Sequence, residues 1–265
     1  MAEIQSVLDQ IYMYLLSLAM AMTRPLGLFI ILPVFTRLGL PDFLRAVVVL
    51  TVALPLAGAL ADPIKEAELT AIRLTVLGFK EVFIGLIMGF LIAIPFWAME
   101  IAGNIVDFQR EAPDASLQDP NATTETSITG TLFVLFAIVY FVSVDGFNIV
   151  FGMIYESYTI WPVLELLPSL NPDLGQNILS LLDQVLRLGF VLAMPLIIPI
   201  FLSMFVLMVI ARFAPQLNVF DLSMAARNIA FFSLISIYSI FLIDYFTNEM
   251  KTLRVVLDKM RLFLQ

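Results

Sequence analysis

Long apolar runs separated by short polar stretches dominate the chain. Six apolar blocks cover roughly residues 10–36, 46–61, 82–99, 131–154, 188–211 and 229–243. A helix that crosses a lipid bilayer needs about 20 predominantly apolar residues. The pattern therefore predicts an all-α membrane protein with about six apolar segments.

Most of these blocks are short for a helix that spans lipid. Arg24-Pro25 interrupts the first and Asp145-Gly146 the fourth, and only 82–99 and 188–211 reach about 18 uncharged residues. Each proline in a helix removes a backbone donor and bends or ends the helix, and the freed carbonyl needs another partner in hydrocarbon. We expect kinked helical hairpins packed among other protein helices, as in an assembly subunit. An ordinary six-span protein with tilted or snorkelling ends is the alternative. Prolines lie in or beside the blocks at Pro25, Pro33, Pro55, Pro95, Pro195 and Pro199.

Composition supports the membrane class and excludes several kinds of chemistry. Apolar residues make up 61% of the chain and charged residues 14%. The absence of Cys and His excludes disulfides, thiol chemistry and imidazole relays, and we expect no metal or other cofactor. A net charge of −8 argues against a nucleic-acid partner. No Lys or Arg precedes Arg24, so we expect the apolar N-terminus to be retained rather than cleaved as a signal peptide.

Charge along the chain conflicts with simple alternating spans. No Lys or Arg lies between Arg110 and Arg187, whereas nine acids do. The positive-inside rule keeps such loops away from the cytoplasm, yet these loops flank both ends of the fourth block. Either that block is a hairpin that turns at Asp145-Gly146, or the topology is not that of a standard polytopic protein.

Two polar stretches are candidates for function. Residues 104–129 form an acidic stretch with Pro113 and Pro120, whose composition predicts an irregular loop. It is either a solvated surface loop or a loop that lines or occludes a cavity. Residues 212–224, here called the joint, separate two apolar runs and are more polar than a helix–helix turn requires. The joint is either an interfacial turn or a specific contact.

The remaining division of the chain follows from these stretches. We expect apolar helices over 1–103, the acidic loop over 104–129 and helical hairpins that include the joint over 130–246. Apolar residues at 3/4 spacing after Thr247 predict an amphipathic helix over 247–265, which lies on the membrane or docks on a partner.

The joint carries a family resemblance. Its sequence Arg212-Phe-Ala-Pro-Gln-Leu-Asn-Val-Phe-Asp-Leu-Ser-Met224 resembles the signature of the export-apparatus family of type III secretion systems that includes SctT, YscT and FliR proteins. Gly103-Asn-Ile-Val-Asp-Phe-Gln-Arg110 is a second match and favours the injectisome branch. Ala225-Ala226-Arg227 departs from the family's continuation after the signature. The resemblance covers essentially the whole chain.

The resemblance implies a single-copy subunit of a helical export gate in the bacterial inner membrane, within the secretion-system basal body. Implied partners are SctR-like, SctS-like and SctU-like subunits, unfolded secretion substrates, inner-rod or needle proteins, and membrane lipid. It also implies that loop 104–129 restricts the closed channel and that the joint makes inter-subunit contacts. The implied plug residues are Asp107, Phe108, Gln109, Arg110 and Glu111. The implied contact residues are Arg212, Pro215, Gln216, Asn218, Phe220 and Asp221.

A secondary transporter of small solutes is the competing hypothesis, because transporters also use broken helices and intramembrane charges. Its candidate site residues are Arg24, Lys80, Glu81 and Asp145. An enzyme fits less well, since no nucleophile–base pair or metal-ligand constellation is evident.

Overall fold

The computed structural model describes residues 2–67, 70–110, 127–166, 174–214, 216 and 218–253, and every regular element in these ranges is a helix. The helices are α1 (Ala2–Ile31), α2 (Pro33–Arg37), α3 (Asp42–Glu66), α4 (Ala71–Gln109), α5 (Ile128–Ser143), α6 (Gly146–Ile160), α7 (Leu174–Phe213) and α8 (Val219–Leu253). In the described part of the chain, five helices are long and apolar enough to cross a membrane, and α5 and α6 together would make a sixth span. The predicted all-α membrane fold is confirmed.

Several helices are longer than the charge pattern suggested. Helix α1 continues through Arg24-Pro25, and α4 extends from Ala71 to Gln109 as one helix. The Arg24-Pro25 interruption of the apolar run therefore does not end the helix. The irregular start expected for the loop was wrong, because residues 104–109 are helical. The fourth block does break at the predicted place, where Asp145 adopts φ of 57° between α5 and α6.

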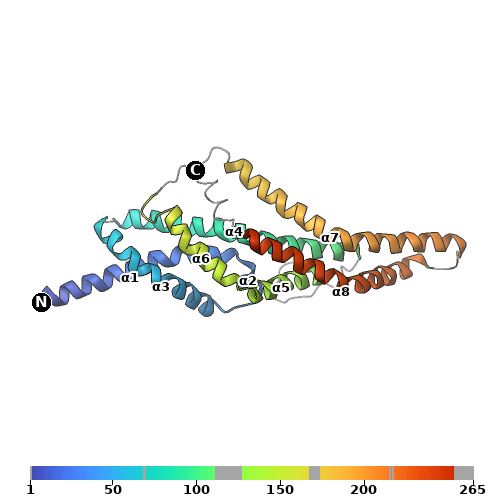
Figure 1. Cartoon of the computed structure of the whole chain (residues 1–265), viewed down its shortest axis with the longest axis horizontal. Helices are drawn as coiled ribbons and strands as arrows, with labels where there is room; N and C mark the ends of the chain where they lie inside the picture. Colours follow the sequence, from blue (N-terminus) through green and yellow to red (C-terminus); the bar gives the residue numbers. More distant parts are fainter. Residues whose placement is uncertain are drawn as a thin grey trace. The chain divides into compact units, whose positions relative to one another are not determined.

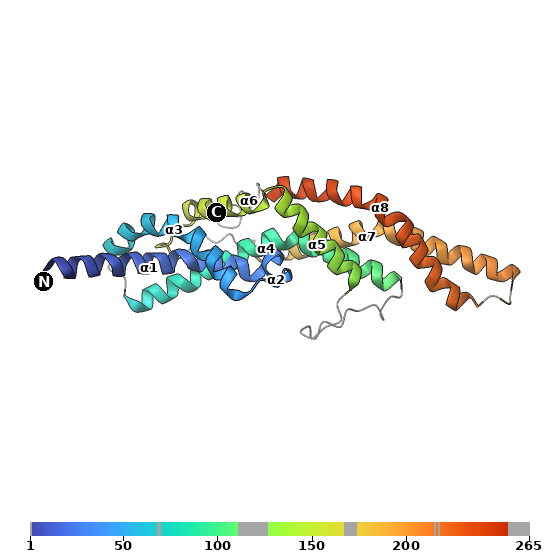
Figure 2. The same ribbon diagram turned by 90° about the horizontal axis from the view of Figure 1, so that it is seen from below.

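The chain divides into two compact units (Figures 1 and 2). One unit contains α1, α2, α3, α6 and the part of α4 up to Ala93. The other contains the rest of α4 from Ile94, α5, most of α7 and most of α8. Residues 247–253 continue α8, and 254–265 lie outside the described residues.

In the first unit, a glycine brings α1 and α4 into close backbone contact. A Cβ placed on Gly85 of α4 would lie 2.9 Å from the Leu28 amide nitrogen of α1, too close for any side chain. Small residues let membrane helices approach in this way. Helix α3 also packs along α1.

In the second unit, aromatic rings form the core between α4, α5 and α8. Phe96 contacts Phe141 and Phe246 edge to face, with ring centroids 5.6 and 5.3 Å apart. All three side chains are fully buried. Such pairs contribute roughly 0.5–1.5 kcal/mol each beyond the burial of their area.

Tyrosine hydroxyls bind helix carbonyls in the turns that precede prolines. Tyr158 donates to the Ala21 carbonyl, 3.1 Å away, which is the group that Pro25 leaves without its usual N–H donor. Tyr155 and Tyr238 donate to the Val52 and Leu192 carbonyls, three residues before Pro55 and Pro195. Of these three carbonyls, only that of Ala21 is one that a proline frees, and the other two lie one residue after the freed positions.

Replacing Tyr238 with Phe removes one such donor and keeps the ring. We expect the free energy of unfolding of the purified protein to fall by about 1 kcal/mol, because the Leu192 carbonyl loses the buried hydrogen bond from the Tyr238 hydroxyl. Thermal unfolding in detergent measures this loss. Ser239→Ala is the control, since that hydroxyl bonds only within its own helix, to the Ser236 carbonyl. Equal midpoints for the two variants would contradict the expectation.

Candidate functional site

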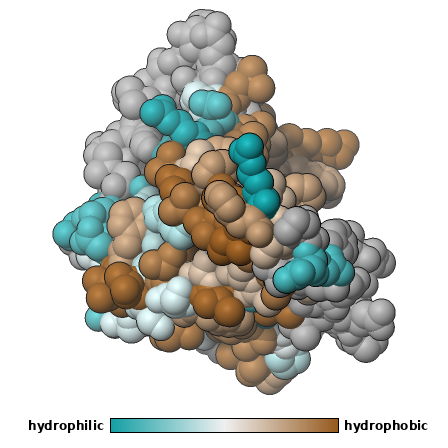
Figure 3. All heavy atoms as spheres, turned by 90° about the vertical axis from the view of Figure 1, so that its right-hand side faces the viewer, coloured by the Kyte–Doolittle hydropathy of each residue, from teal (hydrophilic) through white to brown (hydrophobic). Residues whose placement is uncertain are grey.

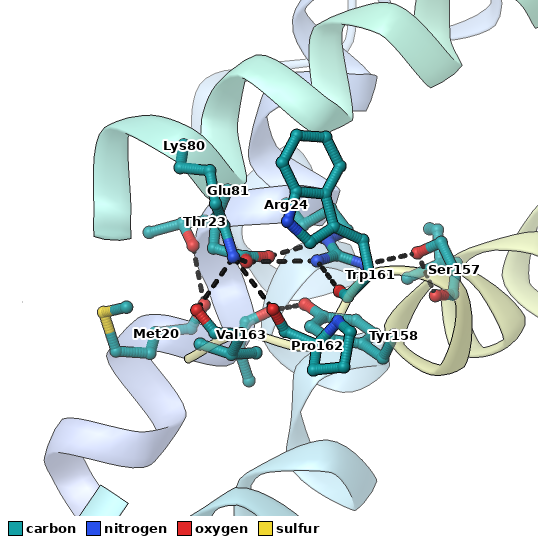
Figure 4. Close-up of polar contacts among 12 residues, drawn as sticks. Met20, Thr23, Arg24, Lys80, Glu81, Ser157, Tyr158, Trp161, Pro162 and Val163 are labelled. Atoms are coloured by element: carbon teal, nitrogen blue, oxygen red, sulfur yellow. Dashed lines mark hydrogen bonds and ion pairs between the residues drawn. The ribbon is translucent and has the colours of Figure 1, made fainter. Parts of the chain in front are cut away.

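A buried group of charged residues, here called the Arg24 cluster, organises the first unit. It consists of Arg24 on α1, Lys80 and Glu81 on α4, and Ser157 and Trp161 at the end of α6 (Figure 4). Arg24 and Glu81 are both fully buried. Two hydrogen bonds join them, 2.6 Å from Nε and 3.0 Å from Nη2 of the guanidinium to the two carboxylate oxygens.

The remaining donors of Arg24 also bind within the chain. Nη1 donates to the Ser157 hydroxyl at 2.8 Å and Nη2 to the Trp161 carbonyl at 2.9 Å. The guanidinium lies over the Tyr158 ring, 3.9 Å from its centroid. A buried charge is stable only when it is paired and hydrogen-bonded, and Arg24 meets that condition with every nitrogen.

Lys80 fixes the segment that follows α6. Its ammonium donates to the carbonyls of Pro162, Val163 and Glu165 at 3.0, 2.8 and 3.0 Å and pairs with Glu81 at 2.7 Å. Figure 4 shows Lys80 reaching from α4 toward these carbonyls. Three of the four transporter candidates are therefore brought together, but they bind the chain's own groups. The fourth, Asp145, is exposed at the start of α6.

A second polar group, here called the loop base, lies in the second unit. It consists of Asp107 and Arg110 at the end of α4, and Ser127 and Thr129 at the start of α5. One Asp107 oxygen accepts from the Ser127 hydroxyl at 2.6 Å and from the Thr129 amide at 2.8 Å. The other accepts from the Thr129 hydroxyl and from Arg110.

This geometry explains why α5 begins where it does. Ser127 is the N-cap, and its hydroxyl accepts from the Gly130 amide at 2.9 Å. The Asp107 carboxylate accepts another amide of the first turn, whose unpaired N–H groups favour negative charge. Asp107 therefore joins the two residues that border the stretch 111–126, which lies outside the described residues.

Arg110 connects the loop base to α8. Its Nε donates to the Asn228 side-chain oxygen at 3.0 Å, and its guanidinium lies 4.1 Å from the Phe231 ring centroid. Burial lowers the pKa of the Arg110 guanidinium, and the Asp107 carboxylate opposes that shift. An arginine keeps its charge despite such a shift, so the pair with Asp107 is ionic.

The five predicted plug residues differ in their surroundings: two are bonded in the loop base, two are exposed, and one is not described by the structure. Asp107 and Arg110 are the centre of the loop base. Phe108 is 85% exposed on the last turn of α4, and Gln109 is exposed there while its carbonyl accepts from Arg227 at 3.3 Å. Glu111 lies outside the described residues. The plug role stays a prediction.

The predicted contact residues of the joint extend from the last turn of α7 into the start of α8. Arg212 is exposed in the last turn of α7, and Gln216 and Asn218 are exposed after it. Pro215 and the side chains of Phe220 and Asp221 lie outside what the structure describes. Helix α8 begins at Val219, so the second half of the joint is helical.

Several residues that bind at the two sites were absent from the sequence-based candidates, among them Ser157 and Trp161 in the Arg24 cluster and Asn228 and Phe231 beside Arg110. Asn228 immediately precedes the sixth apolar block and Phe231 lies within it, and nothing in the local pattern marks either as a partner of Arg110. In the described part of the chain, no group of three or more His, Cys, Asp or Glu residues could hold a metal ion.

Known proteins of one family are similar to this sequence over most of its length. The family model "Bacterial export proteins, family 1" matches residues 15–253. The Yop proteins translocation protein T of Yersinia pestis is 35% identical over 259 residues, which cover 97% of this chain and 98% of the relative. Surface presentation of antigens protein SpaR of Shigella flexneri is 31% identical, covering 91% and 90%. Flagellar biosynthetic protein FliR of Bacillus subtilis is 26% identical, covering 68% and 72%.

The Arg24 cluster yields a stability prediction. Glu81→Gln leaves two buried cations without their carboxylate, and breaking such a pair costs about 3–5 kcal/mol. We expect poor yield of the variant and a large drop in its unfolding midpoint in detergent. Glu66→Gln, at an exposed glutamate that ends α3, is the matched control and should behave as the parent chain. A Glu81 variant as stable as this control would show that the pair is dispensable.

Proposed function

The chain belongs to family 1 of the bacterial export proteins, and from that membership we propose that it is a single-copy core subunit of a type III secretion export gate. In this proposal it helps to form the protein-conducting pore across the bacterial inner membrane and catalyses no reaction. Its partners are SctR-like, SctS-like and SctU-like subunits, and its cargo is unfolded secretion substrates, including inner-rod or needle proteins. The names of its relatives, such as Yop proteins translocation protein T and secretion system apparatus protein SsaT, support a role in secretion.

The exposed apolar surface of α7 supports assembly with other helices or lipid. In the most apolar window of α7, 22% of the residues are buried by the chain itself, compared with 67% in that of α4. Phe201, Phe205 and Phe213 are 62%, 53% and 83% exposed. Figure 3, seen from the right-hand side of Figure 1, shows brown apolar side chains on this face with teal polar side chains between them.

The loop base supports the gating part of the proposal. Asp107 ties the end of α4 to the start of α5, so the stretch between them leaves and re-enters the helices at one fixed place. A loop that restricts a channel requires such a fixed attachment. Beside it, Phe108 offers an apolar ring that its own chain leaves exposed.

Replacing residues 111–126 with a short Gly-Ser linker tests the gating role while it retains Asp107 and Arg110. We expect resting ion conductance of the reconstituted gate to rise, because the restriction is lost while the loop base is kept. Planar-bilayer recording measures it. A linker variant in which Asp107 is also replaced by Ala controls for the loop base. Unchanged conductance in the linker variant would refute the plug.

Arg212→Ala tests the joint as a contact between subunits. Because Arg212 is exposed, we expect it to alter binding to neighbouring subunits rather than insertion of this chain. Co-purification of the partner subunits should fall several-fold and secretion should decrease. Arg73→Ala, at another exposed arginine near the start of α4, is the matched control. Equal recovery of partners with both variants would contradict a contact role for the joint.

A further inference from the structure

The first turns of α8 hold the end of α4. Asn228 accepts from Arg110, and the Phe231 and Phe232 rings lie 4.1 and 5.5 Å from the Arg110 guanidinium. The preceding residue, Arg227, donates to the Gln109 carbonyl at 3.3 Å and to the Ser223 hydroxyl at 3.4 Å. Helix α8 thus binds the Gln109 carbonyl and the Arg110 side chain, which immediately precede the stretch 111–126.

The same helix starts inside the joint. Val219 opens α8, and Asn228 follows within that continuous helix. At about 1.5 Å of rise per residue, these two positions are roughly 14 Å apart along the axis. The two polar stretches singled out in the sequence are therefore physically connected through the first turns of α8.

The end of the hairpin is anchored weakly by its own chain. No described side chain of α7 after Ile200 is buried, and among the α8 side chains that the structure describes, the first buried ones are Ser223 and Arg227. A neighbouring subunit that binds the joint could therefore displace this end of the hairpin while breaking few buried contacts before Arg227. From there onward, any shift of α8 must carry Arg110 with it or break the contacts of Arg110.

We propose that Asn228 and Phe231 are positioning residues that set the end of α4, and that α8 transmits a displacement at the joint to Phe108. This inference rests on the proposed function for its biological meaning. Arg110 also binds Asp107 and the Thr129 hydroxyl, so a shift of Arg110 reaches the start of α5 as well. The joint and the loop base then act as one mechanical element within the second unit.

A single-cysteine reporter tests this connection, since the chain contains no cysteine of its own. Phe108→Cys is introduced, and the rate of labelling by a membrane-impermeant maleimide is measured in the purified, assembled complex. We expect Asn228→Leu to raise that rate about tenfold, the factor that corresponds to one lost hydrogen bond to a charged group. Asn228→Asp keeps an acceptor for Arg110 and should stay within about twofold of the parent.

Two further variants guard against trivial explanations. Phe231→Leu keeps an apolar side chain and removes the ring beside the Arg110 guanidinium, so it should also accelerate labelling. It serves as the test variant if Asn228→Leu does not assemble. Ser239→Ala changes a hydroxyl elsewhere on α8 and should leave the rate unchanged. Equal rates for the parent, Asn228→Leu and Phe231→Leu would overturn the inference, and so would equal rates for the Asp and Leu variants of Asn228.

The transmission step has its own test. Arg212→Ala should change the labelling rate of Phe108→Cys in complexes that do assemble, and this effect should disappear when Asn228→Leu is also present. Effects that add independently would overturn the route through α8. The readout needs no conductance, so its failure is distinct from that of the plug, which the linker variant tests by itself.

Discussion

A guanidinium, carboxylate or carbonyl that is buried away from water in this chain needs a hydrogen bond or an ion pair from another part of the chain. This requirement determines how the helices are arranged. Arg24 could not lie fully buried in α1 without Glu81 opposite it, Ser157 beside it and the Trp161 carbonyl beyond. These bonds join three helices at one point. The tyrosines near the prolines meet the same requirement for the backbone, which is strictest where no water is available.

Helix α4 carries both polar groups, because it contributes Lys80 and Glu81 to the first unit and Asp107 and Arg110 to the second. The two groups differ in what they hold. The Arg24 cluster binds the end of a helix and the segment after it with a dense set of short contacts. The loop base binds helix ends on either side of a long polar stretch, so it fixes where that stretch begins and returns. A charged group can thus stabilise the fold in one unit and position the ends of a long polar stretch in the other.

The sequence predicted the helical membrane fold, the break at Asp145 and the two polar stretches, since each depends on local composition. The sequence could not show that α1 continues through Arg24, because a charge that interrupts an apolar run is accommodated in a helix when it is paired. Its partner Glu81 lies 57 residues away, a separation that no local pattern reveals. Ser127 and Thr129 before an apolar run signal a helix start. The Asp107 carboxylate that completes that start belongs to another helix and could be found only in the structure.

Burial is distributed in a way that separates internal support from assembly. The chain itself buries 67% of the residues in the most apolar window of α4 but only 22% in that of α7. The exposed surface of α7 packs against little of its own chain and so adds little to the stability of the isolated subunit. In a bilayer, the hydrophobic effect does not favour one apolar neighbour over another. Shape and a few polar contacts must then decide which helices bind there. The joint supplies exposed polar residues at the end of that surface, and its second half belongs to α8, the helix that binds Arg110. In the proposed assembly, the residues that select a neighbour therefore adjoin the helix that positions the loop base.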